Sequence, residues 1–181
     1  DLSRVEVLAE DGVRMLTLTW NGENQLASGS ATSHGLSPLG RAAVTALEGA
    51  GILVDVSHLN DQGFREMLKA ARRPFAASHS NARSVCPHPR NLADWQVREM
   101  ADRGCLIGLN YYAPFLRAGG GQADWDDLCR HAEHLLSLGA GDCLALGSDF
   151  DGADLPPCLD CCGKVPGLIR LLADRLGQEQ A

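Results

Sequence analysis

The sequence predicts an α/β fold in which parallel strands alternate with covering helices. Short apolar runs of strand length alternate with longer amphipathic segments along almost the whole chain. The runs are almost continuously apolar, which is typical of strands buried on both faces of a parallel sheet. The 181 residues, of which 45% are hydrophobic, are enough to bury a core. We therefore expect one domain over residues 1–181, built from right-handed β-α-β connections.

Five strands and five helices are expected, in strict alternation. The strands cover residues 13–20, 52–57, 75–78, 105–110 and 143–148. The helices cover residues 38–49, 61–71, 94–102, 125–138 and 166–176. Ser37 followed by Pro38 is a helix N-cap with proline at the first position, and Gly49, Gly104 and Gly139 stand where helices should end.

The polar residues that end each strand help to choose between two parallel architectures, a doubly wound sheet and a (β/α)8 barrel. In both, reactive side chains gather at the carboxyl ends of the strands. No glycine-rich dinucleotide or phosphate-binding loop follows any strand here, although such loops are the common reason for a doubly wound sheet. The barrel is therefore favoured.

Composition excludes several classes of partner. The net charge is −7 and the basic residues are scattered, so the chain offers no stripe for a phosphate backbone and we expect no nucleic acid partner. No apolar run reaches the roughly 20 residues that cross a bilayer, so no membrane segment is expected. The seven cysteines are an odd number and fit a reduced, cytoplasmic protein. The C-x-x-C-C triplet at 158–162 lacks the second Cys/His pair of a structural zinc site.

His58 and His79 are the sharpest candidates for chemistry. Each directly follows an apolar strand, and the two strands are consecutive. Neighbouring strands lie about 4.8 Å apart, so imidazoles at equivalent ends can reach one metal ion or two adjacent ones. Neutral imidazole is a common zinc ligand. The alternative is that each histidine fills a polar pocket at its strand end.

Asp149 ends the last strand in the sequence GSDFDG at 147–152. A carboxylate at such a turn can ligate a metal, move a proton or hold an ammonium group. The simpler explanation is a turn aspartate that bonds its own backbone. Because Phe150 separates two carboxylates, we expect Asp149 rather than Asp151 to point inward.

Asp55 and Arg90 complete the candidate residues. Asp55 lies in an otherwise apolar strand, where a buried carboxylate needs a partner, so it is expected either to support the site from a second shell or to be structural. Arg90 follows the stiff Cys-Pro-His-Pro segment at 86–89 and is suited to a bidentate contact with a carboxylate, with a plain surface arginine as the alternative. No serine nucleophile elbow and no Cys–His pair at a strand end are present.

Five sequence blocks together resemble the renal (membrane) dipeptidase family of binuclear zinc peptidases. They are GLSPLGR at 35–41, LVDVSH at 53–58, ASHSNAR at 77–83, PHPRNL at 87–92 and ALGSDFDG at 145–152. The segment TLTWNGEN at 17–24 is similar to the bacterial branch of that family.

The resemblance implies a metallo-dependent-hydrolase (β/α)8 barrel that hydrolyses dipeptides with two zinc ions. It implies that His58 and His79 are ligands of one zinc. It also implies that Arg90 holds the substrate carboxylate, and that Asp149 lies by the scissile bond and the substrate amine and assists proton transfer. Trp20 stands where the animal members carry a substrate-contacting histidine, so that contact is not expected here.

The resemblance also implies that part of the barrel is outside this chain. The family's H-x-D pair and metal-bridging glutamate are not found, and the chain corresponds to strands four to eight, with residues 1–4 similar to the helix after that glutamate. We therefore expect a C-terminal portion of the barrel with five βα units, inactive by itself and either poorly stable or a homo-oligomer. A non-catalytic binding module and another amidohydrolase-like enzyme are the alternatives. Against the latter, neither lysine, Lys69 or Lys164, follows a strand where it could be carboxylated.

Overall fold

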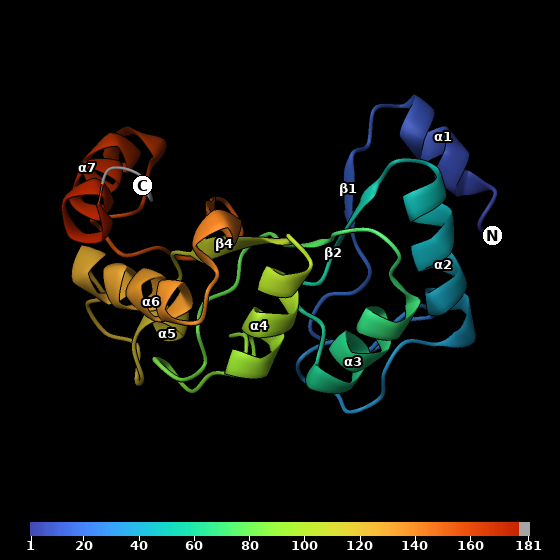
Figure 1. The fold of residues 1–181 in the computed structure, drawn as a ribbon, viewed down its shortest axis with the longest axis horizontal. Coiled ribbons are helices and arrows are strands. Elements are labelled where there is room, and N and C mark those ends of the chain that lie inside the picture. Colours follow the sequence, from blue (N-terminus) through green and yellow to red (C-terminus); the bar gives the residue numbers. More distant parts are fainter. Residues whose placement is uncertain (178–181) are drawn as a thin grey trace. The chain divides into compact units, whose positions relative to one another are not determined.

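A computed structural model describes residues 1–177 and divides the chain into two compact units. Unit 1 is Asp1–Ser78 and unit 2 is His79–Ala181. Five strands alternate with helices, as the sequence predicts, and the strand pairs within each unit are parallel (Figure 1). No helix in residues 1–177 is long and apolar enough to cross a membrane.

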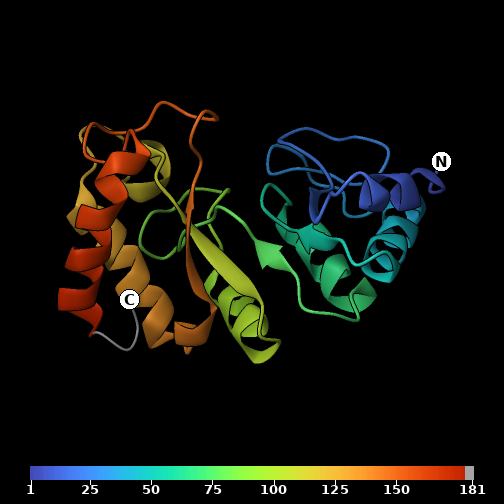
Figure 2. The same ribbon diagram turned by 90° about the horizontal axis from the view of Figure 1, so that it is seen from above.

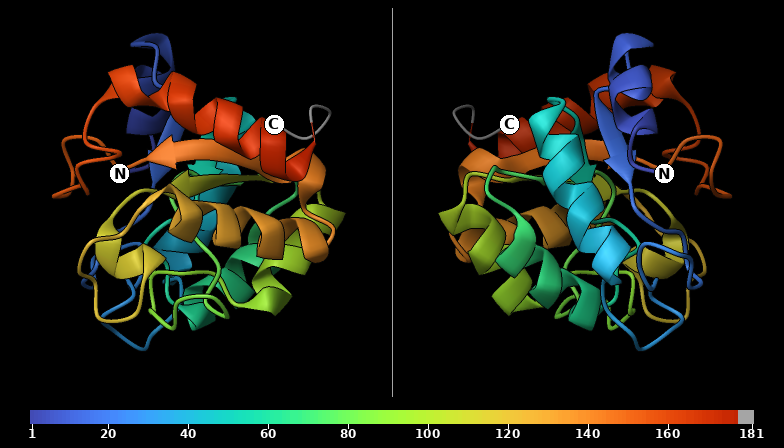
Figure 3. Two further views of the ribbon diagram at one scale, coloured as in Figure 1. Left: turned by 90° about the vertical axis from the view of Figure 1, so that its left-hand side faces the viewer. Right: turned by 90° about the vertical axis from the view of Figure 1, so that its right-hand side faces the viewer.

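Unit 1 contains three short parallel strands and three helices. In chain order they are α1 (Arg4–Glu10), β1 (Met15–Thr17), α2 (Pro38–Gly49), β2 (Leu53–Asp55), α3 (Asp61–Ala70) and β3 (Ala76–Ala77). Thr17 lies opposite Asp55 in the β1–β2 pair, and Asp55 lies opposite Ala76 in the β2–β3 pair. Helices α2 and α3 pack against each other, and α2 is seen lengthwise on the right of Figure 3.

Unit 2 contains a longer parallel pair and its covering helices. The elements are α4 (Asp94–Asp102), β4 (Leu106–Asn110), α5 (Ala113–Leu116), α6 (Trp125–Ser137), the 3-10 helix η1 (Gly141–Cys143), β5 (Leu144–Ser148), the 3-10 helix η2 (Cys162–Lys164) and α7 (Val165–Leu176). Strands β4 and β5 run side by side, with a register shift at Asn110, and α7 lies beside α6 (Figure 2).

The observed helix bounds agree with the predicted ones to within one residue, whereas the strands are shorter. The first strand was expected to include residues 18–20, but it ends at Thr17. The Leu18 carbonyl accepts a hydrogen bond from the Asn24 side chain and not from a neighbouring strand. Helix α2 ends at Gly49, as expected, and the residue with a positive φ after it is Gly51. Helix α5 has no counterpart among the predicted helices, since four residues show no period.

Side-chain caps begin three of the helices. The Ser37 hydroxyl accepts from the Gly40 N–H at 2.9 Å, and the Asn60 side chain accepts from the Gly63 N–H at 2.7 Å. Asp124 accepts from the Asp127 N–H at 3.0 Å. These bonds satisfy backbone donors that the first turn of a helix leaves without partners.

Gly40 lets the long connection from β1 to α2 approach the helix closely. A Cβ at this position would lie 1.9 Å from the Leu26 carbonyl oxygen. That oxygen also accepts from the Ser37 N–H at 2.8 Å, so it cannot retreat without losing the start of the helix. The glycine is therefore required by packing and not by backbone conformation.

We predict that Gly40→Ala destabilises the chain by about 2 kcal/mol, although alanine is the better helix former by roughly 1 kcal/mol. The urea unfolding midpoint measures this. Gly49→Ala, at the open end of the same helix where an added Cβ meets nothing within 4 Å, is the matched control and should be neutral or stabilising. Equal effects of the two substitutions would contradict the packing argument.

Candidate active site

Backbone strain marks the ends of two strands. Among residues 1–177 the non-glycine residues with positive φ are His58 (77°), Ser148 (50°), Asp149 (82°) and Asp151 (62°). Ser148 ends β5, and the others follow β2 or β5, at the carboxyl ends where a parallel α/β fold gathers its reactive groups. Left-handed conformations cost non-glycine residues about 1 kcal/mol or more and concentrate at functional sites.

Asp55 is a buried carboxylate with four hydrogen bonds. One oxygen accepts from the Ser57 N–H at 3.0 Å and the Ser78 N–H at 2.8 Å, and the other from the Thr17 hydroxyl at 2.7 Å and the Ser78 hydroxyl at 2.6 Å. Burial by itself raises the pKa of Asp55, but the bonds from Ser78, Ser57 and Thr17 outweigh it and hold the pKa below its usual value. Asp55 therefore joins the residues that end β1, β2 and β3, and it fixes the backbone just before His58.

We predict that Asp55→Ala destabilises the chain by about 3 kcal/mol, because four donors lose a common acceptor. Asp55→Asn should cost less, about 1 kcal/mol, since the Thr17 and Ser78 hydroxyls can rotate to accept from an amide. The part of the stability that comes from the ionised carboxylate is present above its ordinary pKa, near 4, and is lost as the pH falls through the lowered value. Urea unfolding from pH 7 to pH 3 tests this. If the wild type and Asp55→Asn lost stability equally over that range, the assignment would be wrong.

His58 is held by the loop that follows β1. Its Nδ1 lies 3.0 Å from the Asn21 amide oxygen. Because an amide oxygen only accepts, Nδ1 carries the proton, and in the neutral ring the lone pair is on Nε2. Trp20 is 72% exposed, and the centre of its ring lies 6.3 Å from the centre of the imidazole. In this tautomer Nε2 is the ring nitrogen that can ligate a metal, with Nδ1–H held by an acceptor.

Asn110, at the end of β4, connects His79 and Asp149. Its amide nitrogen donates to the Asp149 carboxylate at 2.9 Å and, more weakly, to the His79 carbonyl at 3.4 Å. The side chain is fully buried. Within unit 2 the structure therefore brings together the two expected residues that follow β3 and β5.

Successive side chains in the turn after β5 contact different partners. Asp149 reaches Asn110, whereas the Phe150 ring packs edge-on against Tyr111 at 5.8 Å. Burial raises the pKa of Tyr111 to about 12, so its phenol stays neutral. Asp151 is exposed. Gly152 leaves room for the acid, since a Cβ there would lie 2.6 Å from an Asp149 oxygen.

Arg90 lies in the compact loop between β3 and α4 and is only 6% exposed. The Arg83 side chain donates to the Asn91 carbonyl at 2.8 Å, and the His88 Nδ1 accepts from the Arg90 N–H at 3.1 Å. The Arg90 guanidinium lies 5.4 Å from the centre of the Phe115 ring. Burial and the charges of Arg90 and Arg83 lower the pKa of His88, so the arginines do not face a third cation at neutral pH.

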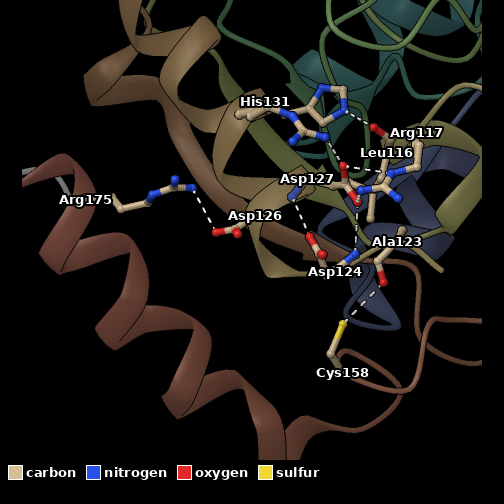
Figure 4. A network of polar contacts seen from close by, with 10 residues as sticks. Leu116, Arg117, Ala123, Asp124, Asp126, Asp127, His131, Cys158 and Arg175 are labelled. Carbon is tan, nitrogen blue, oxygen red and sulfur yellow. Dashed lines mark hydrogen bonds and ion pairs between the residues drawn. The ribbon is translucent and has the colours of Figure 1, made fainter.

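Helix α6 contacts this loop through His131, and its Asp127 forms an ionic cluster with the segment that follows α5 (Figure 4). The fully buried Asp127 pairs with Arg117 at 3.1 Å and with Arg130, and it accepts from the Asp124 N–H. The His131 Nδ1 accepts from the Ala82 N–H at 3.1 Å, and its Nε2 therefore donates to the Leu116 carbonyl at 3.0 Å.

His131 should make stability depend on pH. Burial lowers its pKa to about 4, against an ordinary value near 6.5. Between these two pH values the unfolded chain therefore binds a proton at His131 that the folded chain does not bind. We predict full stability above about pH 6.5 and a loss approaching roughly 3 kcal/mol as the pH falls to about 4. Urea unfolding between pH 8 and pH 4 measures this slope, and His131→Gln should flatten it. His34→Gln, at an exposed histidine, is the control and should not.

Sequence reasoning missed several residues that organise the site. Asn81 and Asn110 are fully buried, and the Asn81 side chain pairs with both backbone groups of Asn110 at 2.9 Å, as a neighbouring strand would. Phe115 and His131 were also missed. Asparagine at the end of two apolar runs was a usable signal, whereas nothing in the local sequence indicates the partners of a helix histidine.

The chain belongs to the membrane dipeptidase family. All of residues 1–181 match the family described as Membrane dipeptidase (Peptidase family M19). An uncharacterised protein from the pqqA 5′ region of Klebsiella pneumoniae is 38% identical over 173 residues, which cover 89% of this chain and 62% of the relative. An uncharacterised dipeptidase of Schizosaccharomyces pombe is 34% identical over 170 residues, covering 91% of this chain and 42% of the relative. The chain spans about half the length of such curated relatives.

Solved structures agree with this assignment. A metallo peptidase from Rhodobacter sphaeroides, liganded with a phosphinate mimic of the dipeptide L-Ala-D-Ala, is similar with a TM-score of 0.89 and 30% identity; the match covers 94% of this chain and 52% of that one. An amidohydrolase from Pseudomonas aeruginosa is similar with a TM-score of 0.89 and 25% identity, over 97% of this chain and 62% of that one. The expected fold, part of a (β/α)8 barrel with five βα units, is confirmed.

The donors needed for a metal site are only partly present. His58 belongs to unit 1 and His79 to unit 2. Within residues 1–177, no three His, Cys, Asp or Glu side chains form a group that could hold a metal ion. The Asp55 oxygens are already engaged by four donors. Two imidazoles suit zinc chemically, but a zinc site takes three or four protein ligands.

Proposed function

We propose that the complete protein containing this chain is a zinc-dependent dipeptidase. The observation that carries the proposal is the similarity, over 94% of the chain, to a metallo peptidase liganded with a phosphinate dipeptide mimic. A phosphinate group imitates the tetrahedral centre that forms when water adds to a peptide carbonyl, and compounds that imitate a transition state bind tightly to the enzyme that stabilises it.

His58 and His79 would each supply an imidazole to a zinc ion. The tautomer of His58 supports the assignment, because the Asn21 amide oxygen holds the proton on Nδ1. Bound zinc would polarise the peptide carbonyl and lower the pKa of bound water to about 7. The remaining ligands would come from outside this chain.

Arg90 and Asp149 fix the two ends of a short substrate. The guanidinium of Arg90 pairs with the substrate carboxylate in a bidentate geometry. Asp149 accepts a hydrogen bond from Asn110 on one oxygen, which orients the carboxylate toward the substrate amine and the scissile bond. There it holds the ammonium group, takes a proton from the attacking water and delivers it to the departing nitrogen. Because both termini of the substrate are bound, dipeptides are preferred over longer peptides.

Activity of the protein encoded by the complete gene tests the proposal. We predict that the purified protein contains zinc, cleaves L-Ala-D-Ala and other dipeptides, loses activity with a chelator and regains it with zinc. Arg90→Met should raise KM by about 100-fold, the value of a charge-assisted bidentate contact, whereas Arg170→Met, at an exposed arginine on α7, should change nothing. A protein with no zinc and no dipeptide cleavage would refute the proposal and leave a non-catalytic module.

A further inference from the structure

We propose that Phe115 is a positioning residue that holds the Arg90 guanidinium in the orientation needed to bind the substrate carboxylate. This inference rests on the proposed function of Arg90 and extends it to a residue that follows a different strand. Arg90 belongs to the loop between β3 and α4, whereas Phe115 belongs to α5, the short helix that follows β4.

The ring of Phe115 lies at the centre of an aromatic platform, which consists of His88, Tyr112 and Phe115. The His88 ring lies 4.4 Å from it, and the Tyr112 ring meets it edge-on at 4.9 Å. The Arg90 guanidinium lies over the same ring at 5.4 Å. Contacts from both neighbours fix the plane of the ring, so the ring can in turn fix the plane of the guanidinium.

The backbone carbonyl of Phe115 also contacts the loop that carries Arg90. Its carbonyl accepts from the Asn91 amide at 2.8 Å and, at 3.5 Å, from the Asn81 amide. Asn91 directly follows Arg90, and its amide also donates to the Cys86 carbonyl. Phe115 therefore contacts Arg90 through its ring and Asn91 through its carbonyl. These two contacts fix the position of α5 relative to the loop that carries Arg90.

Burial makes the ring contact energetically relevant. Arg90 is 6% exposed, and a guanidinium removed from water gains more from an aromatic face than an exposed one. His88 does not compete as a second cation on the ring at neutral pH, since burial and the two nearby arginines disfavour its protonation. The platform thus offers one oriented cation to an incoming carboxylate.

The electron density of the ring is the property to vary, because it changes the attraction to a cation while keeping the shape. Replacing Phe115 by phenylalanines with one, two and three ring fluorines, in the protein encoded by the complete gene, should raise KM for L-Ala-D-Ala stepwise by roughly 2- to 30-fold, with kcat unchanged. A dipeptide amide lacks the carboxylate, so its kinetic parameters should not follow the series. Phe115→Tyr keeps the ring and should resemble the wild type, whereas Phe115→Leu should resemble the trifluorinated protein.

The outcomes separate this inference from the proposed function. A wild-type protein that cleaves no dipeptide overturns the proposed function. A wild-type protein that cleaves L-Ala-D-Ala, combined with a KM that does not change along the fluorinated series, overturns the role of Phe115 alone. A parallel loss of kcat and unfolding midpoint in the series also overturns it, because it would show that the ring only supports folding.

Discussion

Polar groups at the buried ends of parallel strands must find partners, and this requirement organises both units. In unit 1 the Asp55 carboxylate collects donors from the residues that end β1, β2 and β3. In unit 2 Asn81 and Asn110 do the same for the residues after β3 and β4. An unpaired buried polar group costs about 1–3 kcal/mol, so these side chains hold the strand ends in single arrangements.

The same side chains also position residues of the candidate active site. Asp55 fixes the backbone just before His58, which then turns into a left-handed conformation. Asn110 orients Asp149, which also lies in that strained region. Strain of this kind persists only where the surroundings determine the position of each residue. Fixed surroundings also provide what catalysis by positioning needs, since a small displacement of a reacting group is costly.

Arg90 shows how groups distant in the sequence combine to support one candidate side chain. Its loop is tied by Arg83 and His88, which are its sequence neighbours. The outer support comes from Phe115 on α5, and α6 holds both the loop and α5 through His131. A buried cation in this setting exchanges part of its hydration for an aromatic face.

The sequence by itself determined the alternation of strands and helices, the N-cap at Ser37, the family and the candidate residues His58, His79, Arg90 and Asp149. These features depend on local periodicity, cap chemistry and residues adjacent to strand ends. Only the tertiary structure decided that Asp55 is saturated by donors, that Asn110 holds Asp149, and that Phe115 and His131 support the Arg90 loop. Such contacts join residues 20 to 50 positions apart in the sequence. Local sequence patterns do not indicate which distant residues come into contact.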